Sequence, residues 1–342
     1  MVHVSARRGL MDNLTHSLVG ALIGQAGLKR RTGLAMPALI VGANLPDVDA
    51  ACFLWLDGVE HLGFRRGITH GPIAWVLLPL VLAGLLWWFD RWQARRGQKR
   101  FGRPEGRLPV HFGWLYALAF IGCLTHPALD WLNVYGIRLL EPFSSRWFYG
   151  DVLFIIDVWL WALLGFATWF SLRREKRGGD WRRPAWIGIA MALGYVGLNA
   201  TITSSSESRF RQSVDELLPA QIYVIASPAL FEFWNRDIIV GDNEGWAEFV
   251  DNPGNHDAIF ALGGTPCKTA KAIRSAARNS ELDAFLFWSR APFAERAPDG
   301  SVILRDARFY DPRARDRFAV ALPDVQCEPL PTSVHAEEAG RS

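Results

Sequence analysis

The chain has little net charge and few cysteines. Lys and Arg exceed Asp and Glu by only three in 342 residues, which is too small an excess to indicate binding along a nucleic-acid backbone. The basic residues fall in short loops between apolar segments, where they act as topology determinants. Cys52 and Cys123 lie in apolar segments and are expected to pack as small hydrophobes. Cys267 and Cys327 would pair if their region is exported, but two cysteines leave this open.

No small-residue cleavage site follows the N-terminal region, so the first 27 residues do not read as a signal peptide. Arg7 and Arg8 precede an apolar run, but Asn13 and His16 interrupt its start. Met11 is an equally good start, which would make residues 1–10 an upstream extension. No internal repeat and no long low-complexity tract is present in the sequence.

Apolar residues are concentrated in residues 14–203, while the remainder of the chain has a soluble composition. A bilayer core requires about 20 apolar residues per helix. We therefore expect a mainly α fold: a polytopic membrane bundle of five to six segments in residues 11–203, a small β or α+β soluble domain in 204–330, and a disordered tail in 331–342. The clear segments are 71–89, 111–132, 152–172 and 184–203; the less certain ones are 14–28 and 34–56.

Loop charge predicts how these segments are oriented. The loops 90–110 and 173–183 are rich in Lys and Arg, and Lys29–Arg31 form a third basic turn. The positive-inside rule places all three in the cytoplasm. Segment 184–203 then runs outward, so the C-terminal domain should be extracytoplasmic, as expected of a multi-pass protein of a bacterial inner membrane.

The region after residue 203 opens with a polar link at 204–208 and continues with short β-like runs. Apparent turns separate some of them, at residues 242–245 and 251–254. The runs are 222–226, 238–240, 284–288, 302–304 and 318–322.

His126 and Asp130 are the most informative pair in the sequence. They are four residues apart at the end of an apolar segment, so they lie on one helical face and can reach a single cation. Three other clusters carry ligand-type residues, and the expected topology places all four on the extracytoplasmic face. These clusters are Thr15-His16, Asn44-Leu-Pro-Asp47-Val-Asp49 and Gly67-Ile-Thr-His70.

Imidazole and carboxylate groups together favour zinc, manganese or ferrous iron. We expect zinc first, in a primary shell made by Asp47, His70, His126 and Asp130. His16 and Asp49 would complete this shell, or hold a second ion that Asp130 bridges. Taken singly, His16 also fits an interfacial histidine, His70 a helix cap, and both Asp47 and Asp49 a helix start stabilised by the dipole.

A cation held by these side chains would lower the pKa of a bound water molecule. Asp49 and Asp130 are the predicted catalytic carboxylates, with Asp49 as the acceptor of the proton. Arg66 and Arg146 are predicted to bind substrate phosphate, although headgroup anchoring explains any single Arg equally well. Asp157, within the run 152–172, is either a substrate-binding acid or a partner of Arg138 or Arg146.

The motifs, taken in order, resemble the YdjM family of inner-membrane, metal-dependent hydrolases over about residues 11–170. The resemblance extends to Pro142-Phe-Ser144 and Ile155-Ile-Asp157, while Gly71 stands where the family often has Ser. The motifs that carry it are Met11-Asp-Asn-Leu-Thr-His16, Asn44-x-Pro-Asp47-x-Asp49, Arg66-Gly-Ile-Thr-His70 and Thr125-His126-Pro-x-x-Asp130.

The order of the ligands is also similar to that of the zinc-dependent phospholipase C and P1 nuclease group. This resemblance implies a helical metal-binding bundle and phosphoesterase chemistry. No His occurs between His126 and His256, so we expect one metal, or two that share a carboxylate, rather than a three-metal cluster.

The sequence thus predicts a membrane-bound, metal-dependent hydrolase that acts at the extracytoplasmic face. Its partners would be the lipid bilayer and an amphiphilic or phosphoester substrate such as a lipid headgroup, with no nucleic acid and no indication of oligomeric state. Two alternatives remain. An ion-coupled transporter would have His or acids along both faces, and a membrane-anchored binding protein would hold a structural metal in a closed four-ligand site.

Overall fold

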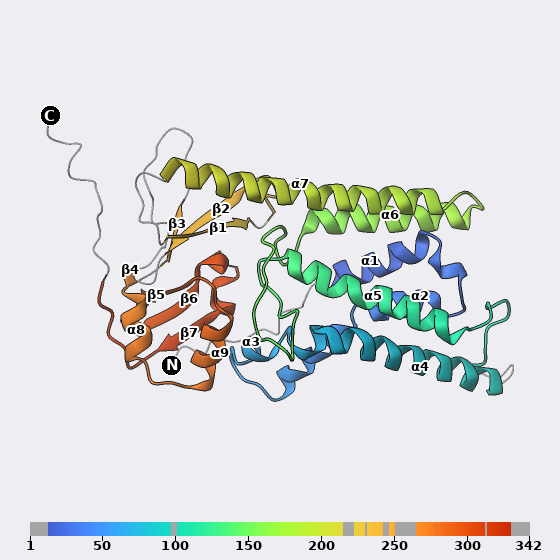
Figure 1. Cartoon of the computed structure of the whole chain (residues 1–342), viewed down its shortest axis with the longest axis horizontal. Coiled ribbons are helices and arrows are strands. Elements are labelled where there is room, and N and C mark those ends of the chain that lie inside the picture. The colour runs from blue at the N-terminus through green and yellow to red at the C-terminus, as the bar shows by residue number, and fades with distance from the viewer. Residues whose placement is uncertain are drawn as a thin grey trace.

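The computed structural model describes residues 13–96, 101–214, 222–229, 231–241, 246–249, 265–311 and 313–329. Long helices run side by side in the first part of the chain, and two small sheets gather at one end of them (Figure 1). This arrangement confirms the mainly α class and the small C-terminal domain that contains strands.

The N-terminal part consists of α-helices and short 3-10 helices. The α-helices are α1 (Asn13–Gln25), α2 (Ala35–Gly42), α3 (His61–Phe64), α4 (Pro72–Arg96), α5 (Phe112–Leu132), α6 (Val158–Lys176) and α7 (Arg182–Val214); the 3-10 helices are η1 (Leu28–Arg30), η2 (Leu45–Leu54) and η3 (Ile68–His70). A helix lies in each apolar segment expected from the sequence, but segment 34–56 is divided between α2 and the 3-10 helix η2, and segment 152–172 becomes helical only at Val158.

Within the described residues, three helices are long and apolar enough to cross a membrane: α4, α5 and α7. The pair α2 and η2, bent by 52°, would make a fourth span. The expected number of five to six spans is not confirmed. Helix α1 has only 13 residues, fewer than the roughly 20 that a bilayer core requires, and α6 ends in a basic turn.

Helices α1, α2 and α5 approach one another closely through glycines. A Cβ atom on Gly122 of α5 would lie 2.5 Å from the carbonyl oxygen of Leu39 in α2, and one on Gly42 would lie 2.7 Å from the oxygen of Ala119. Small residues permit this backbone approach in membrane helices. As a result, α1, α2 and α5 pack closely against one another within the bundle.

Helix α7 is continuous over 33 residues, about 50 Å at 1.5 Å per residue. It runs beside α6 and continues over the sheet formed by β1, β2 and β3 (Figure 1). The predicted polar link at residues 204–208 is therefore helical and forms part of α7. A helix that is longer than a bilayer core joins the bundle to the C-terminal sheets.

The C-terminal sheets are both antiparallel. One has the order β1-β2-β3 and the other the order β4-β5-β6-β7. Cys267 and Cys327 form a disulfide beside the second sheet. The elements are β1 (Tyr223–Pro228), β2 (Arg236–Gly241), β3 (Trp246–Phe249), β4 (Thr265–Cys267), α8 (Thr269–Ser275), α9 (Ser280–Trp288), β5 (Pro292–Arg296), β6 (Val302–Asp306), η4 (Ala307–Phe309), η5 (Arg315–Arg317) and β7 (Ala319–Leu322).

Four of the five predicted strand runs correspond to strands, but the run 284–288 does not. It lies in α9, which Asn279 caps by accepting a hydrogen bond from the backbone N–H of Leu282 at 2.8 Å. Leu282, Phe285 and Trp288 are buried on one helical face. A short apolar run has no periodicity that separates a strand from a buried helix. The predicted turns at 242–245 and 251–254 and the tail at 331–342 lie outside the described residues.

The second C-terminal sheet and α9, together called the C-terminal module (residues 265–329), share one hydrophobic core with two loops of the bundle. Val59 and Leu62 come from the first of these, a connection that includes α3, and Val134 and Tyr135 come from the second. Trp288 and Phe285 are at the centre of this core, which buries them completely. The C-terminal module therefore packs directly on the loops that follow η2 and α5.

Candidate metal centre

Four segments of the bundle bring the predicted ligands together. His16 lies on α1, Asp47 and Asp49 on η2, His70 on η3, and His126 with Asp130 on α5. On α5 the buried positions recur every three or four residues from Leu115 to Asp130, so the face that packs against α2 ends in the two ligands. Pro46 in the first turn of η2 starts that helix beside Asp47.

Two imidazole nitrogens of this cluster each lie near two carboxylate oxygens. Oδ2 of Asp130 lies 3.4 Å from Nε2 of His70 and 3.5 Å from Nε2 of His126. Oδ1 of Asp47 lies 3.7 Å from Nε2 of His126 and 4.0 Å from Nε2 of His70. Two ligands bound tetrahedrally at about 2.0 Å from zinc are about 3.3 Å apart. The spacing of Asp47, His70 and His126, which form one group of candidate ligands, suits one small cation.

His16 forms a second group with His126 and Asp130. Its ring stacks on that of His126, with centroids 3.8 Å apart and planes inclined by 18°. Its Nε2 atom lies 3.5 Å from Oδ1 of Asp130, the oxygen that does not face His70. Asp130 thus has one oxygen toward each group, which is the arrangement expected if it bridges two positions.

Three of the candidate ligand atoms lack a hydrogen bond within the part of the chain that the structure describes. Among the described residues, Nε2 of His70, Nε2 of His126 and Oδ2 of Asp130 are buried and have no hydrogen-bond partner. Nδ1 of His126 lies 2.7 Å from the carbonyl oxygen of Ala43. Because a carbonyl oxygen only accepts, Nδ1 carries a proton, and in the neutral ring Nε2 keeps its lone pair. The residues therefore fit a bound divalent metal.

Asp49 is in neither group of candidate ligands. Its oxygens accept hydrogen bonds from Nε of Arg65 at 2.9 Å, the backbone N–H of Arg66 at 2.8 Å and the hydroxyl of Thr69 at 3.2 Å. Oδ2 also lies 3.5 Å from Nδ1 of His70. The structure places Asp49 behind the ring of His70, where it can orient the ring.

Two buried arginines balance the carboxylates. Nη2 of Arg65 contacts Asp47 at 2.5 Å and Asp49 at 2.9 Å. Nε of Arg66 lies 3.0 Å from Oδ2 of Asp130. Burial opposes the charge on Arg65, but Asp49 and then Asp47 outweigh it and raise the pKa of its guanidinium above the ordinary value. The sequence placed Arg66 with the substrate, and the structure places it within the cluster.

The loop after α5 surrounds Arg66. Asn133 and Gly136 accept hydrogen bonds from its Nη1 atom, and its guanidinium lies 4.5 Å from the ring centre of Tyr135. Arg138, from the same loop, donates to the carbonyl oxygens of residues 63–65 and pairs with Glu141 at 2.9 Å. These contacts hold the segment that leads to His70.

The other two predicted substrate residues have contacts outside the cluster. The guanidinium of Arg146 lies 5.5 Å from the ring centre of Phe148. Asp157 caps α6: it accepts from the backbone N–H of Leu160 and from the hydroxyl of Tyr195, both at 2.8 Å. The described contacts of Asp157 include neither Arg138 nor Arg146. The predicted substrate roles of Asp157 and Arg146 stay predictions.

Residues that the sequence did not single out complete the surroundings of the cluster. Thr69 lies 3.0 Å from Nδ1 of His70, and its place next to that His was the only signal for it. Asn133 follows Asp130 by three residues, which is one helical turn. Ala43 contributes only its backbone oxygen, which no side-chain pattern could reveal. Tyr135 became relevant only through tertiary contact with Arg66.

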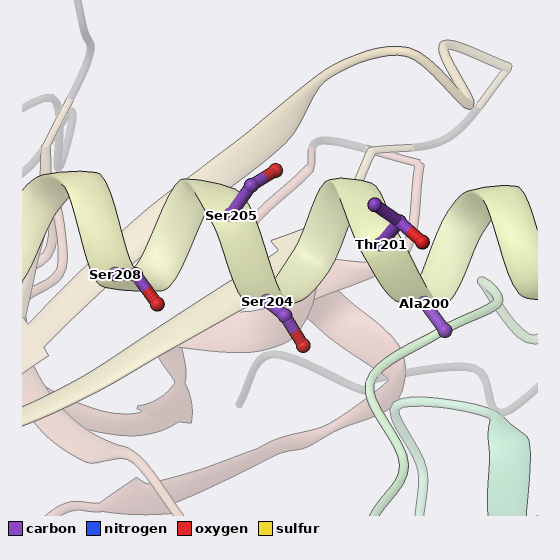
Figure 2. Close-up of a pocket in the computed structure, with 5 residues that line it drawn as sticks. All are labelled: Ala200, Thr201, Ser204, Ser205 and Ser208. Carbon is purple, nitrogen blue, oxygen red and sulfur yellow. The ribbon is translucent and has the colours of Figure 1, made fainter.

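A separate pocket lies against α7. Ala200, Thr201, Ser204, Ser205 and Ser208 line it, all from that one helix (Figure 2). Small hydroxyl side chains are weak metal ligands, and none of the His or Asp residues of the cluster contributes. The pocket is therefore no part of the candidate metal centre.

Comparison with known proteins bears on the bundle and its cluster. A model of the YdjM inner membrane protein family matches residues 11–205, which is more than half of the chain. The match includes α1 to α6 and all six predicted metal ligands, and it confirms the resemblance found in the motifs. No curated protein and no solved structure matches the chain. With its apolar helices, the chain is a membrane protein located in the inner membrane. The chain belongs to the YdjM inner membrane protein family.

Proposed function

We propose that this protein is a metal-dependent hydrolase that cleaves a phosphoester, such as a lipid headgroup, at the extracytoplasmic face of the membrane. The observation that carries the proposal is that two imidazole nitrogens, of His70 and His126, each lie 3.4 to 4.0 Å from carboxylate oxygens of Asp47 and Asp130. Three of these four atoms are buried without a hydrogen-bond partner among the described residues.

His70, His126 and Asp130 would hold the metal, with Asp47 beside them. When bound, a divalent cation supplies a hydroxide nucleophile near neutral pH by lowering the pKa of its water. Two His and one carboxylate with one open position is a pattern of catalytic zinc sites. Asp47 is also held by Arg65 at 2.5 Å, and this competition favours leaving the fourth position to water. Zinc suits this donor set best, and manganese or iron would also fit.

The charges of the cluster favour an anionic substrate. Three carboxylates (Asp47, Asp49 and Asp130) face two guanidinium groups (Arg65 and Arg66), which leaves one net negative charge when the histidines are neutral. A divalent cation reverses this to one net positive charge. Arg66 then offers a guanidinium fork next to the metal ligand Asp130, and such forks suit phosphate oxygens.

The surroundings favour an amphiphilic substrate. Ile68, two residues before His70, is 66% exposed, and Phe143 in the neighbouring loop is 75% exposed. The loop that carries Phe143 packs on Gly71, where a Cβ atom would lie 1.9 Å from the oxygen of Glu141. Exposed apolar side chains beside the ends of membrane helices suit contact with lipid.

Charge supports the extracytoplasmic placement. The last turns of α4 and α6 are basic, and η1 carries Lys29 and Arg30. Lys29 forms an ion pair with Glu175 at the end of α6. Helix α5 starts near this end at Phe112 and reaches Asp130 18 residues later, about 27 Å away, which is close to the thickness of a bilayer core. If the basic end is cytoplasmic, the cluster and the C-terminal module lie outside.

The test is hydrolysis by the full-length protein in detergent, loaded with zinc or manganese. Bis(p-nitrophenyl) phosphate and phosphatidic acid in mixed micelles serve as substrates. Asp130→Asn is the variant, and Asp237→Asn on β2, outside the cluster, is the matched control. Metal-dependent product release that Asp130→Asn abolishes and Asp237→Asn retains supports the proposal. No release from either substrate by metal-saturated protein contradicts it.

A second candidate is a structural metal, because all four candidate ligands are almost entirely buried; their side chains are 0–9% exposed. A closed four-ligand site stabilises a fold without catalysis. In that case metal removal lowers the unfolding temperature, and no phosphoester is cleaved. Measuring both quantities on the same metal-stripped and reloaded sample separates the two candidates.

A further inference from the structure

The hydrogen bonds of the C-terminal module reach the loop that surrounds Arg66. Nε1 of Trp288 donates to the carbonyl oxygen of Tyr135 at 3.1 Å, and Nη1 of Arg308 donates to that of Val134 at 2.7 Å. Both side chains are buried. Two consecutive carbonyl groups of the loop are thus held by donors from a part of the chain more than 150 residues later.

Arg308 is itself fixed in position. Its Nε and Nη2 atoms donate to the two oxygens of Asp306 at 2.8 and 2.7 Å, and the side chains of both residues are fully buried. Ser289 donates to Asp306 at 2.6 Å. A bidentate, buried pair holds the guanidinium in one orientation, so the remaining nitrogen is directed at the loop.

The loop transmits this constraint to Arg66. Nη1 of Arg66 donates to Asn133 at 2.9 Å and to the oxygen of Gly136 at 3.0 Å, on either side of the two clamped carbonyls. Asn133 also accepts from the backbone N–H of Tyr135 at 2.9 Å. Movement of residues 134–135 would therefore displace every group that holds the Nη1 end of this guanidinium.

Both donors lie outside the residues that the family model matches. The match ends at residue 205, whereas Trp288 and Arg308 belong to the C-terminal module. The orientation of Arg66, which lies within the match, thus depends on side chains beyond it.

We propose that Trp288 and Arg308 are positioning residues: they fix the loop 133–136, which orients Arg66 against Asp130. The effect on a metal rests on the proposed function, whereas the effect on the loop does not. Two readouts on the full-length protein in detergent therefore test the proposal. The variants are Trp288→Phe, which keeps a ring but removes the N–H, and Arg308→Lys, which keeps the charge. Leu304→Ala is the matched control, because Leu304 is buried in the same core.

The first readout is amide hydrogen exchange of residues 133–138 without added metal. We expect exchange about tenfold faster in Trp288→Phe and Arg308→Lys, and little change in Leu304→Ala. Unchanged exchange in both positioning variants overturns the proposal. So does equal acceleration in Leu304→Ala, because loss of packing alone would then explain the effect. This readout tests whether Trp288 and Arg308 fix the loop even if the wild type binds no metal. Absence of metal binding would contradict only the proposed function.

The second readout is the zinc dissociation constant, measured by competition with a chelator. Changes in the partners of metal ligands weaken affinity by about 10-fold to 100-fold, and we expect the lower end for residues that act through Arg66. The same substitutions are repeated in an Arg66→Gln background. If the two substitutions no longer weaken zinc affinity in that background, they act through Arg66. If they weaken it as much as in the wild-type background, the proposed action through Arg66 is wrong.

Discussion

Asp49 lies on the Nδ1 side of the His70 ring, with its Oδ2 atom 3.5 Å from that nitrogen. The Nε2 atom of the same ring faces Oδ2 of Asp130 at 3.4 Å. A carboxylate behind a metal-binding imidazole orients the ring and raises its basicity. The structure thus supports separate roles for two acids that the sequence grouped together.

Asp49→Asn should weaken metal binding by about 10-fold to 100-fold while leaving the stoichiometry unchanged when metal is in excess. The variant should also unfold at a lower temperature. Breaking a buried ion pair costs about 3–5 kcal/mol, and Arg65 keeps its contact with Asp47, so we expect the lower end. Chelator competition and thermal unfolding measure the two effects. A loss of stoichiometry equal to that of Asp130→Asn would make Asp49 a direct ligand instead.

The acids Asp130 and Asp157 should respond differently to the same substitution. Asp130→Asn should remove most of the bound metal, because it alters a carboxylate whose two oxygens face His16 and His70. Asp157→Asn should leave metal content unchanged and cost at most about 1 kcal/mol, since Asn is also a good helix cap. Metal analysis of both purified variants checks this. A drop in metal content in Asp157→Asn would place Asp157 in the site.

Asp237 predicts a pH dependence in the C-terminal part of the chain. Burial, followed by the nearby carboxylates of Glu232 and Asp311, raises the pKa of Asp237 to about 6. The folded chain then holds this proton more tightly than the unfolded chain does. The contribution of Asp237 to the free energy of unfolding is therefore most favourable below pH 4, and it is lost as the pH rises through 6.

Asp237→Asn should accordingly raise the apparent unfolding temperature by a few degrees at pH 7.5. The difference from wild type should shrink as the pH is lowered and vanish near pH 4. A series of melting curves from pH 4 to pH 8 measures it. A difference that stays constant over this range would mean that the titration of Asp237 does not cause it.

From the disulfide we expect a definite number of reactive thiols, and counting them tests the extracytoplasmic placement of the C-terminal module. Cys267 and Cys327 are paired across 60 residues, whereas Cys52 and Cys123 are free and buried. Closing a loop of this length stabilises a fold by about 4 kcal/mol in the chain-entropy model. Disulfides persist in oxidising compartments, so protein isolated without reductant should contain the bond if the C-terminal module is extracytoplasmic.

Denatured protein should then bind two equivalents of a thiol reagent before reduction and four after it, since the chain has four cysteines, two of them free. Cys327→Ser should bind three equivalents in both states. Four reactive thiols in unreduced wild type would contradict the disulfide and weaken the extracytoplasmic placement.

The parts of the site that depend on local geometry could be predicted from the sequence. The spacing of His126 and Asp130 fixes both on one face of a helix whatever surrounds it. Loop charge and ligand position, two independent features, assigned the clusters to one end of the bundle. The order of the motifs indicated the YdjM family, and the match of the family model to residues 11–205 confirms it.

The parts that depend on tertiary packing could not be predicted. Nothing in the sequence near Arg65 shows that its guanidinium is fully buried between Asp47 and Asp49. The residue pair Trp288 and Tyr135 is separated by more than 150 positions, and only the shared core brings it together. The helix at 280–288 was mistaken for a strand because short apolar runs suit both structures.

The most direct test of the metal centre is the metal content per chain of the detergent-purified protein, for wild type, His126→Ala and the matched control His61→Ala. His61 is outside the cluster, with its Nδ1 atom 3.1 Å from the oxygen of Gly58. The structure predicts near-stoichiometric metal in wild type and His61→Ala, and a sharp loss in His126→Ala. Wild-type protein that binds no metal even after zinc or manganese is supplied would contradict the metal centre and the hydrolase proposed from it.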